Sequence, residues 1–119
     1  MLLTDGTTKQ LHCLAQVQPI RDALEVVGGK WKVLVLTSIM QGSRRFREIE
    51  TSIPKLNPKV LAKELKDLEE HQLIRRTVYE DDYPVRIEYT ATEYAYTLKQ
   101  VMLELHAWGE NHRRKVFGK

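Results

Sequence analysis

The stretch that decides the fold is residues 57–71, which read NPKVLAKELKDLEEH. Asparagine is a favoured helix N-cap and proline suits the first helical position, so Asn57-Pro58 predicts a helix that runs to about His71. At 100° per residue, one narrow arc of this helix carries three leucines, Leu61, Leu65 and Leu68. The opposite arc carries three lysines, Lys59, Lys63 and Lys66. The stretch therefore predicts an amphipathic helix with a buried apolar face and a basic outer face.

The flanking segments surround this helix with short helices and a hairpin. Apolar spacing, Pro19 as a first-turn residue and the break at Gly28-Gly29 predict the first helix. After residue 73 the apolar period changes from 3.6 to 2, and residues 80–84 supply a turn. The expected elements are helices at 19–27, 30–40, 46–52 and 58–71, a hairpin at 74–90, and a last helix capped by Thr92 that ends near 117. This order predicts a mainly α fold with a small β-hairpin: a winged helix-turn-helix with an added helix at each end.

Length and composition limit the chain to one domain. It has 119 residues, of which 42% are hydrophobic and 29% charged, as in an ordinary globular domain. Its longest purely apolar run, residues 33–36, is far shorter than the roughly 20 residues of a membrane span. Residues 1–6 show no basic, apolar signal sequence. We therefore expect a single cytoplasmic domain over residues 1–119 that does not bind a membrane.

Positive charge is concentrated around the central helix. The chain has a net charge of +3, yet residues 44–63 alone carry +4. Segregated basic charge favours DNA, because each neutralised phosphate releases counterions. The predicted contacts in this window are Arg44, Arg45, Lys55, Asn57, Lys59 and Lys63. The alternative is that the lysine face is ordinary solvated surface.

The hairpin gives a mixed signal. Arg75, Arg76 and Arg86 would reach the DNA backbone or minor groove, whereas the carboxylates of residues 80–82 at its tip would repel phosphate. We select Arg86 as the predicted contact because it lies just inside the tip. The alternative is a hairpin whose tip does not touch DNA.

The last expected helix has a longer apolar stripe than a small core can absorb. At 1.5 Å per residue it would extend about 35–40 Å. The surplus predicts a partner helix, and in a small regulator the usual partner is a second copy. The predicted dimerisation residues are Leu98, Val101, Met102, Leu105, Trp108 and His112. The alternative is that the stripe belongs entirely to the chain's own core.

Signals for catalysis, metals and cofactors are weak. The four histidines lack metal-ligand spacing, and the chain has no nucleophile elbow, Walker loop or dinucleotide fingerprint. A single cysteine excludes an intrachain disulfide and a cysteine-rich zinc site. We expect a protein that is not an enzyme and that has no cofactor or bound metal.

From residue 19 to about 112 the chain resembles the HxlR-type family of bacterial winged-helix regulators, relatives of the MarR group. The motifs that carry the resemblance are Gly28-Gly29-Lys30-Trp31, Arg45-Phe46-Arg47-Glu48-Ile49, Asn57-Pro58-Lys59-Val60-Leu61, Leu65-Lys66-Asp67-Leu68-Glu69, Leu73-Ile74-Arg75-Arg76, Pro84-Val85-Arg86-Ile87-Glu88-Tyr89 and Trp108-Gly109. The resemblance implies a homodimer that pairs through its terminal helices.

That resemblance also implies a function. Double-stranded DNA would be bound by a core at residues 19–91, with helix 58–71 in the major groove and hairpin 74–90 as the wing. Residues 92–117 would form the dimerisation helix. The implied function is sequence-specific transcriptional regulation, under an unidentified small-molecule or redox signal. The alternatives are a winged-helix module for protein–protein interaction and an architectural nucleic-acid-binding module without operator specificity.

Cys13 is the candidate redox-sensing residue. In many members of the resembled family a cysteine directly precedes the proline of the first conserved helix, but Gln18 occupies that position here. Cys13 lies five residues upstream, beside His12 and near Lys9. A reactive thiol needs a positive or helix N-terminal environment. The alternative is an inert, half-buried side chain.

We predict that Cys13→Ser binds DNA like the parent protein and responds in the same way to mild peroxide or diamide. Gel-shift titrations before and after oxidation test this. If oxidation releases the parent from DNA but not the variant, the cysteine is a switch. A dimer-sized band on a non-reducing gel would then indicate a disulfide across the two-fold axis.

Overall fold

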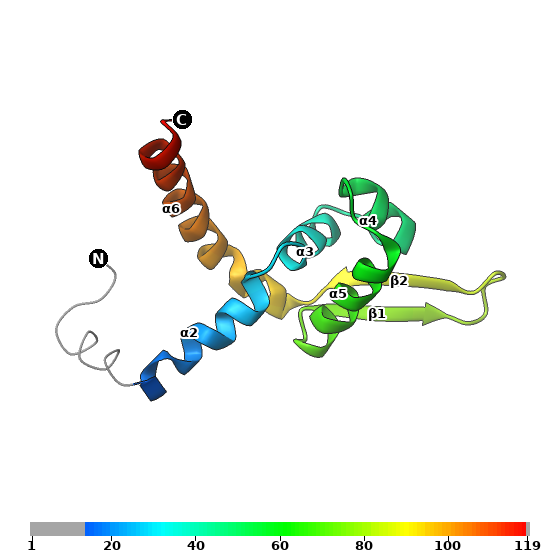
Figure 1. Ribbon diagram of the computed structural model, residues 1–119. Helices are drawn as coiled ribbons and strands as arrows, with labels where there is room; N and C mark the ends of the chain where they lie inside the picture. Colours follow the sequence, from blue (N-terminus) through cyan, green and yellow to red (C-terminus); the bar gives the residue numbers. More distant parts are fainter. Residues whose placement is uncertain (1–13, 119) are drawn as a thin grey trace.

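The computed structural model describes residues 14–118. Its elements, in chain order, are α2 (Leu14–Val27), α3 (Lys32–Met40), α4 (Phe46–Ser52), α5 (Pro58–Glu70), β1 (Ile74–Tyr79), β2 (Arg86–Ala91), a 3-10 segment (Glu93–Leu98) and α6 (Lys99–Phe117). Helices α3, α4 and α5 gather at the base of the hairpin, while α2 and α6 project from the other side of the body (Figure 1). This arrangement confirms the predicted winged helix-turn-helix.

The core is built around the apolar face of α5. Leu61 and Leu68 are completely buried and Leu65 is 3% exposed. They pack with buried side chains of α3, α4, the turns that flank α5, β1 and the 3-10 segment: Val35, Leu36, Ile39, Ile49, Ile53, Leu56, Leu73, Ile74 and Ala95. The leucine arc predicted from the sequence is therefore the centre of the domain, and its burial turns the lysine arc outward.

The start of α5 is fixed by local interactions. The Asn57 side-chain oxygen accepts the Val60 N–H at 2.8 Å, and Pro58 occupies the first helical position, which confirms the predicted cap. The preceding turn places Lys55 at a φ of 67°, a left-handed conformation that costs a non-glycine residue about 1–2 kcal/mol. Ile53 and Leu56, each 7% exposed, anchor the turn on both sides of Lys55.

The hairpin is attached to the helices at its base. Strands β1 and β2 pair antiparallel, with Ile74 opposite Ala91 and Tyr79 opposite Arg86. The Tyr89 N–H donates to the Arg44 carbonyl at 2.8 Å, so β2 is bonded to the segment between α3 and α4. The wing therefore has a fixed position relative to the residues that precede α4.

The first described helix begins earlier than predicted. Pro19 lies inside α2, which runs from Leu14 to Val27, so its assignment to the first turn was wrong. Proline has a helical φ and removes only one hydrogen bond to the preceding turn, although this is usually unfavourable. The Gln18 amide donates to Asp22 Oδ1 at 2.8 Å and links the turns on either side of the proline.

The last helix is divided in two. The predicted cap is confirmed, since the Thr92 hydroxyl oxygen accepts the Ala95 N–H at 3.2 Å. However, Glu93–Leu98 winds as a 3-10 helix, and α6 begins only at Lys99. The Thr97 hydroxyl donates to the Tyr94 carbonyl at 2.6 Å, an interaction that competes with regular helical bonding. The tighter winding places Ala95 in the core, with no exposed area.

Helix α6 is 19 residues long, and none of its residues is buried. Its apolar side chains are therefore left without a complete cover in the single chain. Across residues 14–118, no helix has the length and apolar character needed to traverse a membrane.

We predict that Leu61→Ala lowers the free energy of unfolding by about 2–5 kcal/mol, because it removes a completely buried side chain and leaves a cavity. Urea denaturation followed by circular dichroism measures the change. The control is Lys59→Ala, an exposed position on the same helix. Equal stability of the two variants would show that α5 does not form the centre of the core.

Candidate nucleic-acid interface

The residues before α4 are held close to the wing. Glu48 Oε1 accepts the backbone N–H groups of Arg44 and Arg45, each at 2.9 Å. These two bonds stabilise the charged carboxylate and hold the pKa of Glu48 below its usual value. Since the Arg44 carbonyl also accepts the Tyr89 N–H, both predicted arginine contacts occupy fixed backbone positions, and both residues are exposed.

Two predicted contacts lie in the turn between α4 and α5. Lys55 is exposed at the left-handed position of the turn, and Asn57 is exposed at the N-cap. The capping bond of Asn57 uses its side-chain oxygen. Both residues stand at the N-terminal end of α5, where the helix dipole also favours an anion.

The lysines of α5 form the outer face of the helix. Lys59, Lys63 and Lys66 are all exposed. Lys63 Nζ bonds Asp67 Oδ2 at 3.0 Å, one helical turn away, yet its side chain remains 71% exposed. The bond to Asp67 raises the pKa of Lys63, and the same bond lowers the pKa of Asp67. Lys63 therefore stays charged and accessible to phosphate.

A lysine of α3 forms ion pairs with the inner side of α5. Lys32, at the start of α3, places Nζ at 3.2 Å from Glu64 Oε1 and 3.4 Å from Asp67 Oδ2. The side chains of Lys32 and Glu64 are each only 13% exposed. Glu64 Oε1 is nevertheless buried without a hydrogen bond from any described residue. The ion pair connects α3 to α5, but it leaves one carboxylate oxygen incompletely satisfied.

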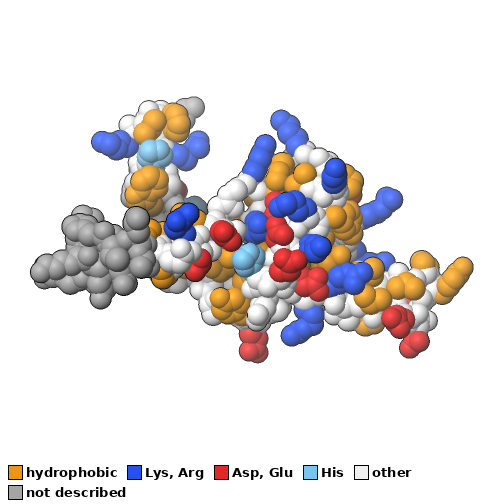
Figure 2. Space-filling model, turned by 60° about the horizontal axis from the view of Figure 1, so that its bottom comes forward, with side chains coloured by type: hydrophobic (Ala, Val, Ile, Leu, Met, Phe, Trp, Pro, Cys, Tyr) orange, Lys and Arg blue, Asp and Glu red, His pale blue; other side chains and the backbone are white. Residues whose placement is uncertain are grey.

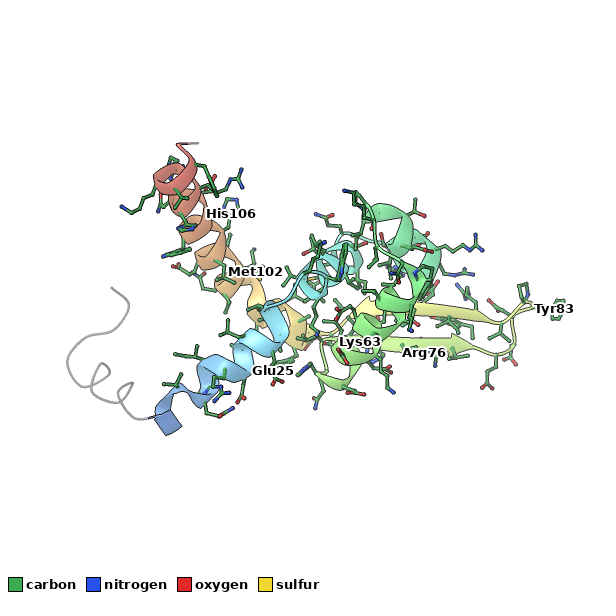
Figure 3. All side chains as sticks on the ribbon, viewed as in Figure 1. Glu25, Lys63, Arg76, Tyr83, Met102 and His106 are labelled. Carbon is green, nitrogen blue, oxygen red and sulfur yellow. The ribbon has the colours of Figure 1, made fainter. Side chains whose placement is uncertain are left out.

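The hairpin register gives a position to Arg76, which was named from the sequence with Arg75 and Arg86 but not selected as a contact. Arg76 pairs with Tyr89, two positions from the pair of the buried Ile74 and the half-buried Ala91. Side chains two apart share a strand face, so Arg76 lies on the α5 side of the wing. Together with Lys66 it lines a small surface hollow between α5 and the hairpin. Figure 3 shows Arg76 and Lys63 on neighbouring elements of this surface. The period-two pattern, counted from Ile74, was the signal that could have identified Arg76.

Arg86 has several interactions within the wing. Its guanidinium bonds Asp82 at 2.8 Å and Glu88 at 3.0 Å, and it lies 4.0 Å from the centre of the Tyr79 ring. The two carboxylates outweigh partial burial and raise the pKa of Arg86. Arg86 remains a predicted DNA contact, but its charge is already balanced inside the hairpin.

We use the term basic surface for the exposed cations around α5: Arg44, Arg45, Lys55, Lys59, Lys63, Lys66 and Arg76. Figure 2 shows Lys and Arg side chains fringing the helical body, whereas hydrophobic and acidic side chains dominate the outer end of the hairpin. The fully exposed Tyr83 marks that end. The cationic groups thus concentrate near the helices rather than at the wing tip.

The predicted dimerisation residues fall on two faces of α6 and of the 3-10 turn that precedes it. Val101, Leu105 and Trp108 are 40%, 45% and 67% exposed, and the Trp108 ring stacks on His112 at a centroid distance of 4.8 Å. These four residues share one helix face by their spacing. Leu98 and Met102 are instead half-buried and line a cavity against α3. The candidate redox residue, Cys13, lies outside the described residues.

Comparisons with known proteins agree with this architecture. The model of the HxlR-like helix-turn-helix family matches residues 26–117. The chain is 36% identical over 99 residues to the uncharacterized HTH-type transcriptional regulator YtcD of Bacillus subtilis, which covers 83% of this chain and 78% of that protein. It is 35% identical over 91 residues to the HTH-type transcriptional regulator YodB of the same organism, which covers 76% and 80%.

Solved structures give the same result. Reduced YodB from B. subtilis superposes with a TM-score of 0.69 at 34% identity, covering 82% of this chain and 91% of that one. The reduced redox regulator HypR superposes with a TM-score of 0.73 at 32% identity, covering 85% and 99%. The family match includes α3, α4, α5 and the hairpin, with the basic surface that they form. The chain therefore belongs to the HxlR-like helix-turn-helix family.

Proposed function

We propose that this chain is a sequence-specific, DNA-binding transcriptional regulator that acts in the cytoplasm as a homodimer. The observation that carries the proposal is the basic surface, which has α5 at its centre and both flanking segments fixed beside it. The relatives support it, because YtcD and YodB are both described as HTH-type transcriptional regulators.

The geometry suits docking in the major groove. In helix-turn-helix proteins the second helix of the motif enters the groove with its N-terminal residues next to base edges. Here that helix is α5, and Lys55, Asn57 and Lys59 cluster at its N-terminal end. Lys63, Lys66 and Arg76 would follow the adjacent phosphates. We add Lys66 and Arg76 to the proposed contacts and assign Arg86 a smaller share, because Asp82 and Glu88 already neutralise it.

A second copy would cover the exposed face of α6. Val101, Leu105, Trp108 and His112 form a continuous stripe that the single chain leaves open. Exposed aromatic and aliphatic side chains in one patch are typical of protein interfaces. A two-fold pairing through this stripe would present two α5 helices to successive half-sites.

The regulatory signal is a separate question. YodB has been solved in reduced, diamide-treated and quinone-bound forms, and HypR in reduced and oxidized forms. For this chain the candidate redox residue is Cys13, and we expect its replacement by serine to leave the response to mild oxidants unchanged.

We predict that changing Lys59 and Lys63 together to alanine makes the plot of log K for DNA binding against log salt concentration less steep. Its slope should fall in magnitude by about 0.9 for each phosphate contact that is lost, for two contacts in all. The fold should be retained, because both side chains are exposed. Binding titrations across a series of salt concentrations, with circular dichroism as a check on folding, measure the effect.

The matched control removes two exposed cations from α6, Arg113 and Lys115. Its salt dependence should stay close to that of the parent. If both double variants behave alike, general charge rather than α5 determines binding. Salt-dependent binding without preference for any duplex would favour the architectural module, and no measurable DNA binding would favour the protein–protein module.

We predict that Trp108→Glu weakens the dimer and, with it, DNA affinity, because one subunit alone contacts only one half-site. Light scattering gives the oligomeric state, and binding titrations give the affinity. The control is Ala107→Glu, which adds the same charge at an exposed position outside the stripe. A Trp108→Glu protein that remains dimeric would exclude the stripe from the interface.

A further inference from the structure

One carboxylate oxygen on α5 is shared by two lysines. Asp67 Oδ2 accepts a hydrogen bond from Lys63 Nζ at 3.0 Å and another from Lys32 Nζ at 3.4 Å. The two cations differ in position, since the side chain of Lys63 is 71% exposed and that of Lys32 only 13% exposed. Asp67 therefore joins a cation of the basic surface to a largely buried cation of α3.

The bond to Asp67 distinguishes Lys63 from the other lysines of the basic surface on α5. Within residues 14–118, ion pairs involve Lys63 but neither Lys59 nor Lys66. A phosphate oxygen that approaches Lys63 meets the negative charge of Asp67 beside it. The two anions compete for one ammonium group and also repel each other. Asp67 therefore opposes the contact that Lys63 would make with DNA.

Lys32 limits this opposition from the inner side of α5. The pKa of Asp67 is lowered chiefly by the bond from Lys63, and the charge of Lys32 lowers it further. Lys32 gives its hydrogen bond to Asp67, whereas Glu64 Oε1, at 3.2 Å, has an ion pair with Lys32 but receives no hydrogen bond from the described residues. When Lys63 turns to a phosphate, Asp67 is thus still neutralised.

We propose that Asp67 competes with DNA phosphate for Lys63, and that Lys32 is the positioning residue that keeps this competition weak. The proposal rests on the proposed function, since it needs α5 to face DNA. An exposed ion pair one helical turn apart changes an equilibrium by up to about twofold. Two α5 helices on one duplex would square this factor, to about fourfold. Asp67 and Lys32 thus set DNA affinity without contacting DNA themselves.

The first test compares Asp67→Asn with Glu70→Gln. The control also removes one negative charge from the same face of α5, at an exposed position that has no ion pair among the described residues. The probe is the duplex of about 30 base pairs that the parent protein selects best from a random pool, long enough for two half-sites. Asp67→Asn should bind it about fourfold more tightly than Glu70→Gln does. Equal affinities would show that general charge accounts for the gain, and would overturn the proposal.

A double-mutant cycle shows whether the gain depends on Lys63. In the Lys63→Met background, Asp67→Asn should raise the affinity no more than Glu70→Gln raises it in the same background. Circular dichroism and urea denaturation of each variant confirm that the fold is retained. A gain from Asp67→Asn that survives the loss of Lys63 would contradict the proposal.

The second test removes Lys32 without changing the net charge. Lys32→Met together with Glu64→Gln deletes one charge of each sign, and it leaves no unpaired carboxylate at Glu64. This protein should bind the duplex about fourfold more weakly than the parent. Addition of Asp67→Asn should restore the parental affinity, a rescue that a merely structural role of Lys32 would not allow. An unchanged affinity of the double variant, or a failed rescue, excludes the positioning role.

A measurement without DNA tests the shared bond itself. In an NMR titration of the full chain, Lys63→Met should raise the pKa of Asp67, because the bond from Lys63 is the largest cause of its lowered value. An unchanged pKa would refute the proposal even if the protein binds DNA. If the parent selects no duplex, the proposed function fails and the proposal with it, whereas the titration still shows whether Asp67 holds Lys63.

Discussion

The burial of one face of α5 is the constraint on which the other features depend. With Leu61 and Leu68 completely buried, the helix has only one orientation in which its apolar arc is removed from water. Burying two leucine side chains contributes several kcal/mol, about 1.5–3 each, which is far more than any exposed lysine contributes. The basic face is therefore a consequence of core packing. Lys59, Lys63 and Lys66 are turned toward solvent because the leucines on the opposite arc are buried, and not because of any interaction that the lysines make.

The flanks of the basic surface are held by backbone hydrogen bonds rather than by side-chain packing. The Arg44 carbonyl accepts from β2, and Glu48 accepts from the backbone of Arg44 and Arg45. Such bonds fix where a residue stands and leave its side chain free to adjust to phosphate. In the wing, by contrast, a side chain is held in place: Arg86 forms ion pairs with Asp82 and Glu88. These ion pairs stabilise the hairpin, but they neutralise the charge that Arg86 could otherwise offer to phosphate.

Features encoded locally could be predicted from the sequence, and features that depend on distant contacts could not. The Asn57-Pro58 start, the leucine arc and the hairpin each depend on residues within a few positions, and all three are confirmed. Pro19 was misplaced because a proline is compatible with the first helical turn, and no nearby residue shows that the helix begins upstream. The 3-10 segment, which places Ala95 in the core, was not predicted because that contact is made with distant residues. Arg76 was named but not selected, because the face on which it lies depends on the strand register.

The two apolar faces of helix α6 have different environments. The stripe of Val101, Leu105 and Trp108 faces away from the chain's own core, while Met102 on the adjacent face borders the cavity against α3. Helix α3 carries Lys32, and Lys32 contacts α5. Because α3 bonds α5 through this ion pair, one face of α6 borders the body of the domain while the stripe on its other face stays exposed.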